Sequence, residues 1–242
     1  MKFIKTSAFL IAILLMQYAM LNAQDKYEYP LNPGMPEWKS LPIEEKNKML
    51  QIPEDKLKSM PTEVLIQAYI DNPFCSLMFA YNTTQDGFNR VSKEFNGLRE
   101  LMKRNDAATK LIVFYKTMQV DGYDVNWEPS EKGRFTFRFV YIETLLSQPE
   151  IINQLNATET KVLINELINK YNKKVELVSE YSIVGLEHCA YAIAHTLNKN
   201  GKLMTQEASV DETLQSFLET GHLSKSNMLD QILQKARAFV QN

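Results

Sequence analysis

The stretch from residue 87 to residue 118 restricts the fold more than any other part of this chain. Its apolar residues recur at steps of three and four in two successive runs, namely Phe88, Val91, Phe95, Leu98, Met102 and then Ala108, Leu111, Ile112, Tyr115, Met118. This spacing predicts two amphipathic helices, each with one apolar face. The short polar turn at 103–106 makes them antiparallel neighbours. Neither helix can bury its apolar face alone, so the fold requires further helices around them.

Polar residues support both of these helices. Asn105 is a good N-cap for the second helix, because its side-chain oxygen can accept a free backbone N–H of the first turn. Glu100 and Arg104 lie four residues apart, in the order that favours an ion pair within the first helix.

The composition agrees with a helical protein. Hydrophobic residues make up 45% of the 242 residues, which is ample for a large core. Only 8 Gly and 9 Pro are present, which is few for an all-β protein with many tight turns. The sequence contains no exact internal repeat. We therefore predict an all-α protein of stacked antiparallel helical hairpins, with an armadillo- or HEAT-like superhelix as a candidate arrangement.

Residues 1–23 have the layout of a secretory signal peptide. Lys2 and Lys5 are followed by the uncharged apolar run 8–16 and by Ala23, a suitable cleavage position. The apolar run is too short for a comfortable membrane span, which needs about 20 residues. We expect cleavage, a secreted or periplasmic location in a bacterial envelope, and no stable membrane insertion afterwards.

The charge balance bears on possible partners. The chain has 27 basic and 29 acidic residues, and losing Lys2 and Lys5 leaves 25 basic residues and a net charge of −4. Nucleic acid binding requires a basic face, so we expect no nucleic acid partner.

After the signal peptide we expect an extended Pro-rich segment at 24–37 and one helical domain at 38–242. The domain starts with a helix over 38–50, for which Ser40 is a possible N-cap and Trp38 a core anchor. A polar internal loop is predicted at 120–133. Tyr123 and Trp127 within it either stack on a ligand or fold back onto the helices.

The next segments carry one ambiguity and several clear helices. Residues 134–142 alternate like a strand, yet Phe135, Phe139 and Ile142 also fit a helical face, so we predict a helix with a short hairpin as the alternative. Asn156 and Glu159 have capping-box spacing before a long helix. Residues 181–197 are nearly apolar and form the candidate central helix, and two further helices are predicted at 210–220 and 226–240.

The cysteines and histidines indicate no metal or cofactor. Cys75 and Cys189 lie in apolar runs. They either form one disulfide or remain buried free thiols. His188 and His195 are seven residues apart, about 10.5 Å along a helix, which is too far for one zinc ion. A zinc site would have to include His222 or Cys75 from a distant helix.

No catalytic residues stand out. Cys189 follows His188 directly, and adjacent helical residues diverge too far to form a dyad. The sequence has no GXSXG elbow and no phosphate-binding glycine loop. It therefore indicates neither catalytic nor specific ligand-binding residues.

A resemblance is carried by turns and packing positions between Trp38 and Tyr115. These are Trp38, Gln51-Ile52-Pro53, Met60-Pro61-Thr62, Gly87-Phe88, Phe95-Asn96, Leu98, Glu100-Leu101 and Arg104. This region, about a third of the chain, resembles uncharacterised exported helical proteins of Bacteroides-type gut bacteria. The resemblance implies export and an all-helical fold, and it implies no site.

We expect an exported, non-catalytic binding or scaffolding protein whose partner is an unknown protein or glycan. Stacked helical hairpins create extended concave surfaces that suit this role. The alternative is an extracytoplasmic hydrolase that acts on cell-wall or dietary polymers, with catalytic groups that meet only in the fold.

Overall fold

The computed structural model describes residues 26–203, 212–225 and 227–241. These residues form helices and connecting loops without a strand. The all-α prediction is therefore confirmed for the described part of the chain, whereas the signal peptide lies outside it. The armadillo-like arrangement stays a prediction.

The N-terminal half consists of short helices. They are α2 (Pro36–Ser40), α3 (Ile43–Met49), α4 (Glu54–Ser59), α5 (Thr62–Asp71), the 3-10 helix η1 (Pro73–Ala80), α6 (Thr84–Glu94), α7 (Asn96–Lys103) and α8 (Ala107–Thr117). The single helix predicted over 38–50 is wrong, because the chain is extended at Leu41 and Pro42. Ser40 ends α2 instead of capping a helix, and Trp38 is half-buried against Phe74.

The first helix predicted within 87–118 is broken in two at Phe95, whose φ of −110° and ψ of 114° are not helical. The break has a clear cause. Asn96 bonds both backbone groups of Ile52 through its side chain, and its own backbone N–H donates to Gln51 Oε1. The Phe95 ring lies where a Cβ on Gly97 would stand. Contacts with a distant segment therefore override the continuous helical pattern.

The second predicted helix exists as α8, but its N-cap is Asp106 and not Asn105. Asp106 makes no capping hydrogen bond and instead accepts one from the Thr62 hydroxyl at 2.8 Å. The predicted ion pair is confirmed, with Arg104 Nε 2.7 Å from Glu100 Oε1.

Helix α9 (Pro129–Leu146) settles the ambiguity at residues 134–142 in favour of a helix. It starts with a capping box of Glu128 and Glu131. The loop predicted over 120–133 is correspondingly too long, because the 3-10 helix η2 (Val120–Gly122) and the first turns of α9 occupy much of it. Tyr123 and Trp127 fold back onto the Phe135 ring.

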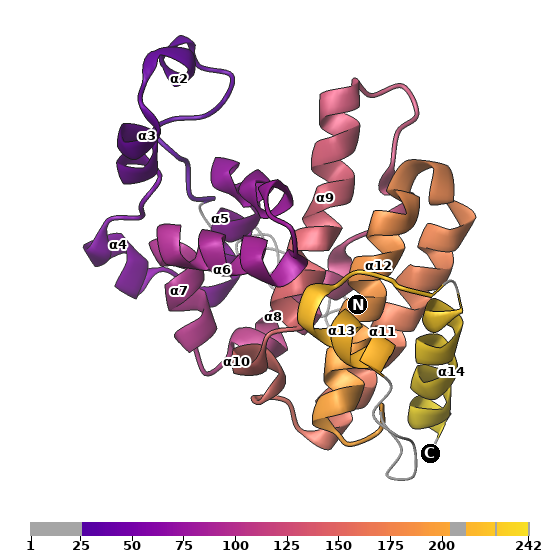
Figure 1. The fold of residues 1–242 in the computed structure, drawn as a ribbon. Coiled ribbons are helices and arrows are strands. Elements are labelled where there is room, and N and C mark those ends of the chain that lie inside the picture. Colours follow the sequence, from indigo (N-terminus) through magenta and orange to yellow (C-terminus); the bar gives the residue numbers. More distant parts are fainter. Residues whose placement is uncertain (1–25, 204–211, 226, 242) are drawn as a thin grey trace, which may run out of the picture.

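The C-terminal half comprises α10 (Pro149–Ile152), α11 (Ala157–Glu176), α12 (Val178–Lys199), α13 (Glu212–Thr220) and α14 (Met228–Gln241). The capping box of Asn156 and Glu159 is confirmed. Helix α12 is the central helix, as predicted, and packs against α9, α11, α13 and α14 (Figure 1). It is bent at Ser182, where φ is 54° and ψ is −178°.

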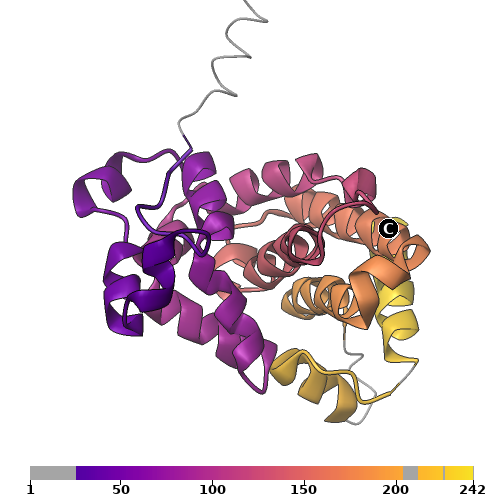
Figure 2. The same cartoon turned by 90° about the horizontal axis from the view of Figure 1, so that it is seen from above.

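Helix α9 joins the two halves of the molecule. It contacts α5, α6 and α8 on one side and α12 on the other. The view from above separates the N-terminal helices from the C-terminal ones, with α9 between them (Figure 2). One hydrophobic core extends from Ile52 to Ala236. Long helices that are apolar on several sides suit such an interior position.

Two further findings concern the cysteines and the apolar character of the helices. Cys75 and Cys189 are both buried and free, so the disulfide alternative is excluded. Within the described residues, no helix combines the length and the apolar character needed to cross a bilayer.

Candidate functional site

A pocket lies where the loop before α6, the middle of α12 and the turn after α13 meet. Its polar lining comprises Thr83, Thr84, Glu187, His188 and His222, and the rest of the wall is formed by Met78, Phe79, Tyr81, Val184 and Gly221. Its cavity volume is about 160 Å³. We call this set of residues the histidine pocket, because it unites two histidines from segments 34 residues apart.

His188 is held by hydrogen bonds on both ring nitrogens. Nδ1 lies 2.8 Å from the Val184 carbonyl oxygen, which can only accept, so Nδ1 carries the proton. Nε2 lies 3.3 Å from the Thr84 hydroxyl and accepts from it. Burial lowers the pKa of His188 to about 4. The ring is therefore a fixed, neutral acceptor at neutral pH.

Glu187 is the only carboxylate in the pocket lining of the described structure. Burial raises its pKa, whereas a hydrogen bond from the Leu223 backbone and the nearby His222 ring act in the opposite direction. His222 is exposed and donates from Nε2 to the Asn82 carbonyl oxygen at 2.5 Å. Glu187 and His222 thus tie the turn after α13 to α12 and to the loop before α6.

Local backbone chemistry explains why these segments meet. Thr83 caps α6 by accepting a hydrogen bond from the Asp86 backbone at 3.0 Å. Gly221 has a φ of +77°, a region that glycine adopts readily. A Cβ at Gly221 would stand 2.7 Å from Thr84 Oγ1. Only glycine therefore permits this close approach.

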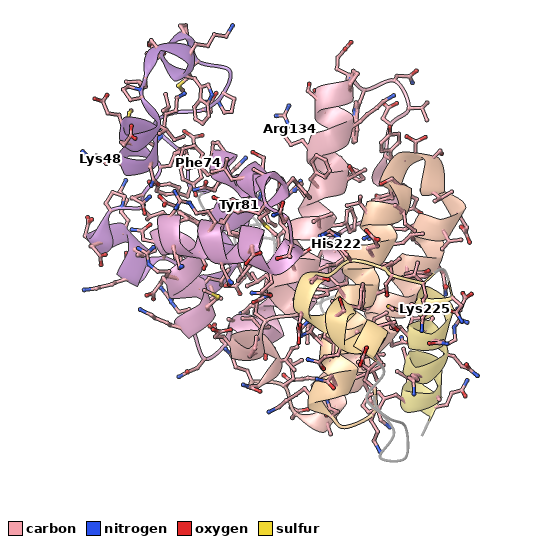
Figure 3. All side chains as sticks on the ribbon, viewed as in Figure 1. Lys48, Phe74, Tyr81, Arg134, His222 and Lys225 are labelled. Atoms are coloured by element: carbon pink, nitrogen blue, oxygen red, sulfur yellow. The ribbon has the colours of Figure 1, made fainter. Side chains whose placement is uncertain are left out.

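Aromatic rings border the pocket on one side. Phe79 and Tyr81 line it and keep 40% and 42% of their surface exposed. Phe79 packs against Phe137, with ring centroids 4.5 Å apart, and against Tyr141, with centroids 6.0 Å apart. Figure 3 labels Tyr81 and His222, which line the pocket from different segments of the chain. The pocket therefore combines fixed polar groups with an accessible apolar edge.

The other residues considered from the sequence lie elsewhere. His195 bonds the Leu218 carbonyl oxygen from Nε2 at 2.9 Å and packs edge-on against Tyr191. Cys189 donates to the Leu167 carbonyl oxygen, and burial raises the pKa of its thiol. His188 and His195 thus do not share a site, whereas His188 and His222 do.

Sequence reasoning missed Thr84 and Glu187 as parts of a site. Thr84 is separated from His188 by 104 positions, and no local pattern links them. The described residues contain no group of three or more metal-ligating side chains. No protein family, curated protein or solved structure that we compared with the chain matches it.

Proposed function

We propose that this protein is an exported binding protein that holds the uncharged end of a glycan in the histidine pocket. The observation that carries the proposal is that hydrogen-bonding side chains, among them the neutral and doubly bonded His188, line the same pocket as exposed aromatic rings. Tyr81 and Phe79 offer ring faces for the apolar side of a sugar. His222, Glu187 and the threonines offer partners for its hydroxyls.

The lining disfavours an anionic ligand. It contains no lysine or arginine among the described residues, and the deeper histidine is neutral. An anionic group would therefore lose its hydration without gaining a counter-charge.

The size of the pocket limits what enters it. Sites for drug-sized ligands measure about 300–1,000 Å³, well above the volume found here. The pocket therefore suits a single ring at the end of a longer molecule, and the aromatic edge would support the next unit.

The experiment is a calorimetric titration of the protein with neutral tetrasaccharides derived from chitin, cellulose and starch. We expect one of them to bind, and Phe79→Ala and Glu187→Gln to weaken that binding by about tenfold each, the loss of roughly 1.4 kcal/mol. Val125→Ala is the matched control, because Val125 is exposed and lies outside the pocket lining. Binding that survives both pocket variants would contradict the proposal.

A second candidate is the hydrolase, for which the contact between Thr84 and His188 is the specific observation. A hydroxyl beside an imidazole whose other nitrogen is held in place resembles a nucleophile and its base. The low pKa of His188 argues against it, because a general base works best near the operating pH. Turnover of chromogenic glycosides or esters that Thr84→Val abolishes and Thr84→Ser retains would favour this candidate.

Export is part of the same proposal. Mass spectrometry of the protein from its host should find a chain that begins at Gln24 or within a few residues of it. A mature chain that still carries residues 1–23 would contradict export by signal cleavage.

A further inference from the structure

A second hollow lies between the end of α8, the start of η2 and the C-terminal half of α11. Its polar lining includes Lys116, Gln119, Asn169, Lys170, Asn172 and Lys173, and its cavity volume is about 440 Å³. We call it the lysine groove. It shares no lining residue with the histidine pocket, so it is a separate feature.

The lysines of the groove differ in how far they are already paired. Lys170 is buried, donates to the Met118 carbonyl oxygen at 2.5 Å and lies 3.0 Å from Glu166. Lys173 lies 3.2 Å from Asp121, which is outside the groove lining. Lys116 is exposed and forms no ion pair with a described residue.

The charge in the groove is opposite in sign to that of the whole protein. Three lysines and one glutamate line it, whereas the chain has a net charge of −2. Like-charged side chains in a concave site raise the local concentration of the opposite ion. The amides of Gln119, Asn169 and Asn172 add hydrogen-bond donors that can orient such an ion.

The exposed carboxylate of Asp121 responds to the charge of these lysines. A hydrogen bond from Lys173 lowers the pKa of its carboxyl group, and the charge of Lys170 adds to the effect. The Asp121 carboxylate thus already pairs with one groove lysine, Lys173, as an external anion would.

We propose that the lysine groove is a binding site for a small doubly charged oxyanion such as a phosphate group. Lys116 and Lys173 contact the anion. The buried Lys170 adds positive charge, and its hydrogen bond to the Met118 carbonyl oxygen holds the wall of the groove in place. Asp121 competes with the anion for Lys173. Lysine binds phosphate as a point charge, so the site accepts phosphate readily and a dicarboxylate where its spacing fits.

The test is calorimetric titration with inorganic phosphate and, separately, with succinate at low ionic strength, where exposed charges are least screened. We expect saturable binding of phosphate. Lys116→Gln and Lys173→Gln should each weaken it about two- to fivefold, the range of an exposed charge pair. Asp121→Asn should strengthen it by a similar factor, because the internal competitor is gone.

Lys161→Gln is the matched control, since Lys161 is exposed on the same helix but does not line the groove. Binding of phosphate without succinate assigns the site to phosphoryl groups, and binding of both assigns it to dianions in general. The proposal is overturned by absence of saturable phosphate binding. It is equally overturned if Lys161→Gln weakens binding as much as Lys173→Gln, or if Asp121→Asn fails to strengthen it.

Discussion

The ammonium nitrogen of Lys174 lies 2.6 Å from Oε1 and 2.8 Å from Oε2 of Glu143, and neither side chain is exposed to solvent. This ion pair joins α11 to α9 inside the core. Glu143 also accepts from the Tyr115 hydroxyl at 2.6 Å, and Lys174 donates to the Gly185 carbonyl oxygen at 3.1 Å. The pair and these two hydrogen bonds thus connect α8, α9, α11 and α12. Each of the two buried charges has the other as its partner.

The first prediction follows from that burial. Lys174→Met should lower the free energy of unfolding by about 3–5 kcal/mol, because it leaves a buried carboxylate without its counter-charge. The double variant Lys174→Met/Glu143→Leu should be more stable than Lys174→Met alone. Denaturant titration measures both, and a double variant less stable than the single one would contradict this view of the pair.

The second prediction concerns pH and His188. Its pKa is near 6.5 when unfolded and about 4 in the fold, where burial disfavours the charged ring. The folded state therefore binds fewer protons between these values, so stability is full above pH 6.5 and falls as the pH drops toward 4. The shift corresponds to roughly 3 kcal/mol.

His188→Gln should remove most of that dependence, since an amide does not titrate in this range. Unfolding free energies measured by denaturant at pH 7 and pH 4.5 provide the comparison. Equal pH dependence in the two proteins would mean that His188 is not the group responsible.

The third prediction concerns the bend in α12. Ser182 has a positive φ of 54° that side chains rarely adopt, and such a conformation costs on the order of 1–3 kcal/mol. Ser182→Gly should raise the free energy of unfolding by about 1 kcal/mol, because relief of strain outweighs the greater freedom of glycine in the unfolded chain. A lower melting temperature for this variant would show that the Ser182 side chain contributes more than the strain costs.

The fourth prediction compares two glycines with positive φ. The Cβ that Gly201→Ala adds would have no atom within 4 Å. This variant should therefore lower the free energy of unfolding only by the left-handed backbone penalty of about 1–2 kcal/mol. Gly221→Ala also collides with Thr84, so it should be more destabilising and should disturb the histidine pocket. Thermal unfolding ranks the two, and an equal effect would mean that Thr84 moves aside without cost.

Much of the fold follows from local pattern, and the exceptions have physical causes. The capping residues Asn156 and Glu159 and the apolar run at 181–197 predict α11 and α12, because both signals act within a few residues. The break at Phe95 is set by Gln51 and Asn96, and their hydrogen bonds form only in the folded protein. The helical spacing of apolar residues contains no information about such distant partners.

The candidate site was less accessible to sequence reasoning. In the sequence His188 is near His195, whereas the structure pairs it with Thr84 and places it in one pocket with His222. The one sequence signal near His222 is the preceding Gly221, which marks a helix end. Nothing in that signal indicates that the turn returns to the start of α6.

The central claim, that the histidine pocket binds the end of a neutral glycan, is tested most directly by the ring signals of the three histidines. NMR spectra of histidine-labelled protein should be recorded during titration with the tetrasaccharide that binds in calorimetry. We predict that the His222 and His188 signals shift with the same midpoint as the calorimetric binding, while His195, bonded to Leu218 away from the pocket, stays in place. Saturation with the sugar that leaves His222 and His188 unmoved, or that moves only His195, would contradict the account.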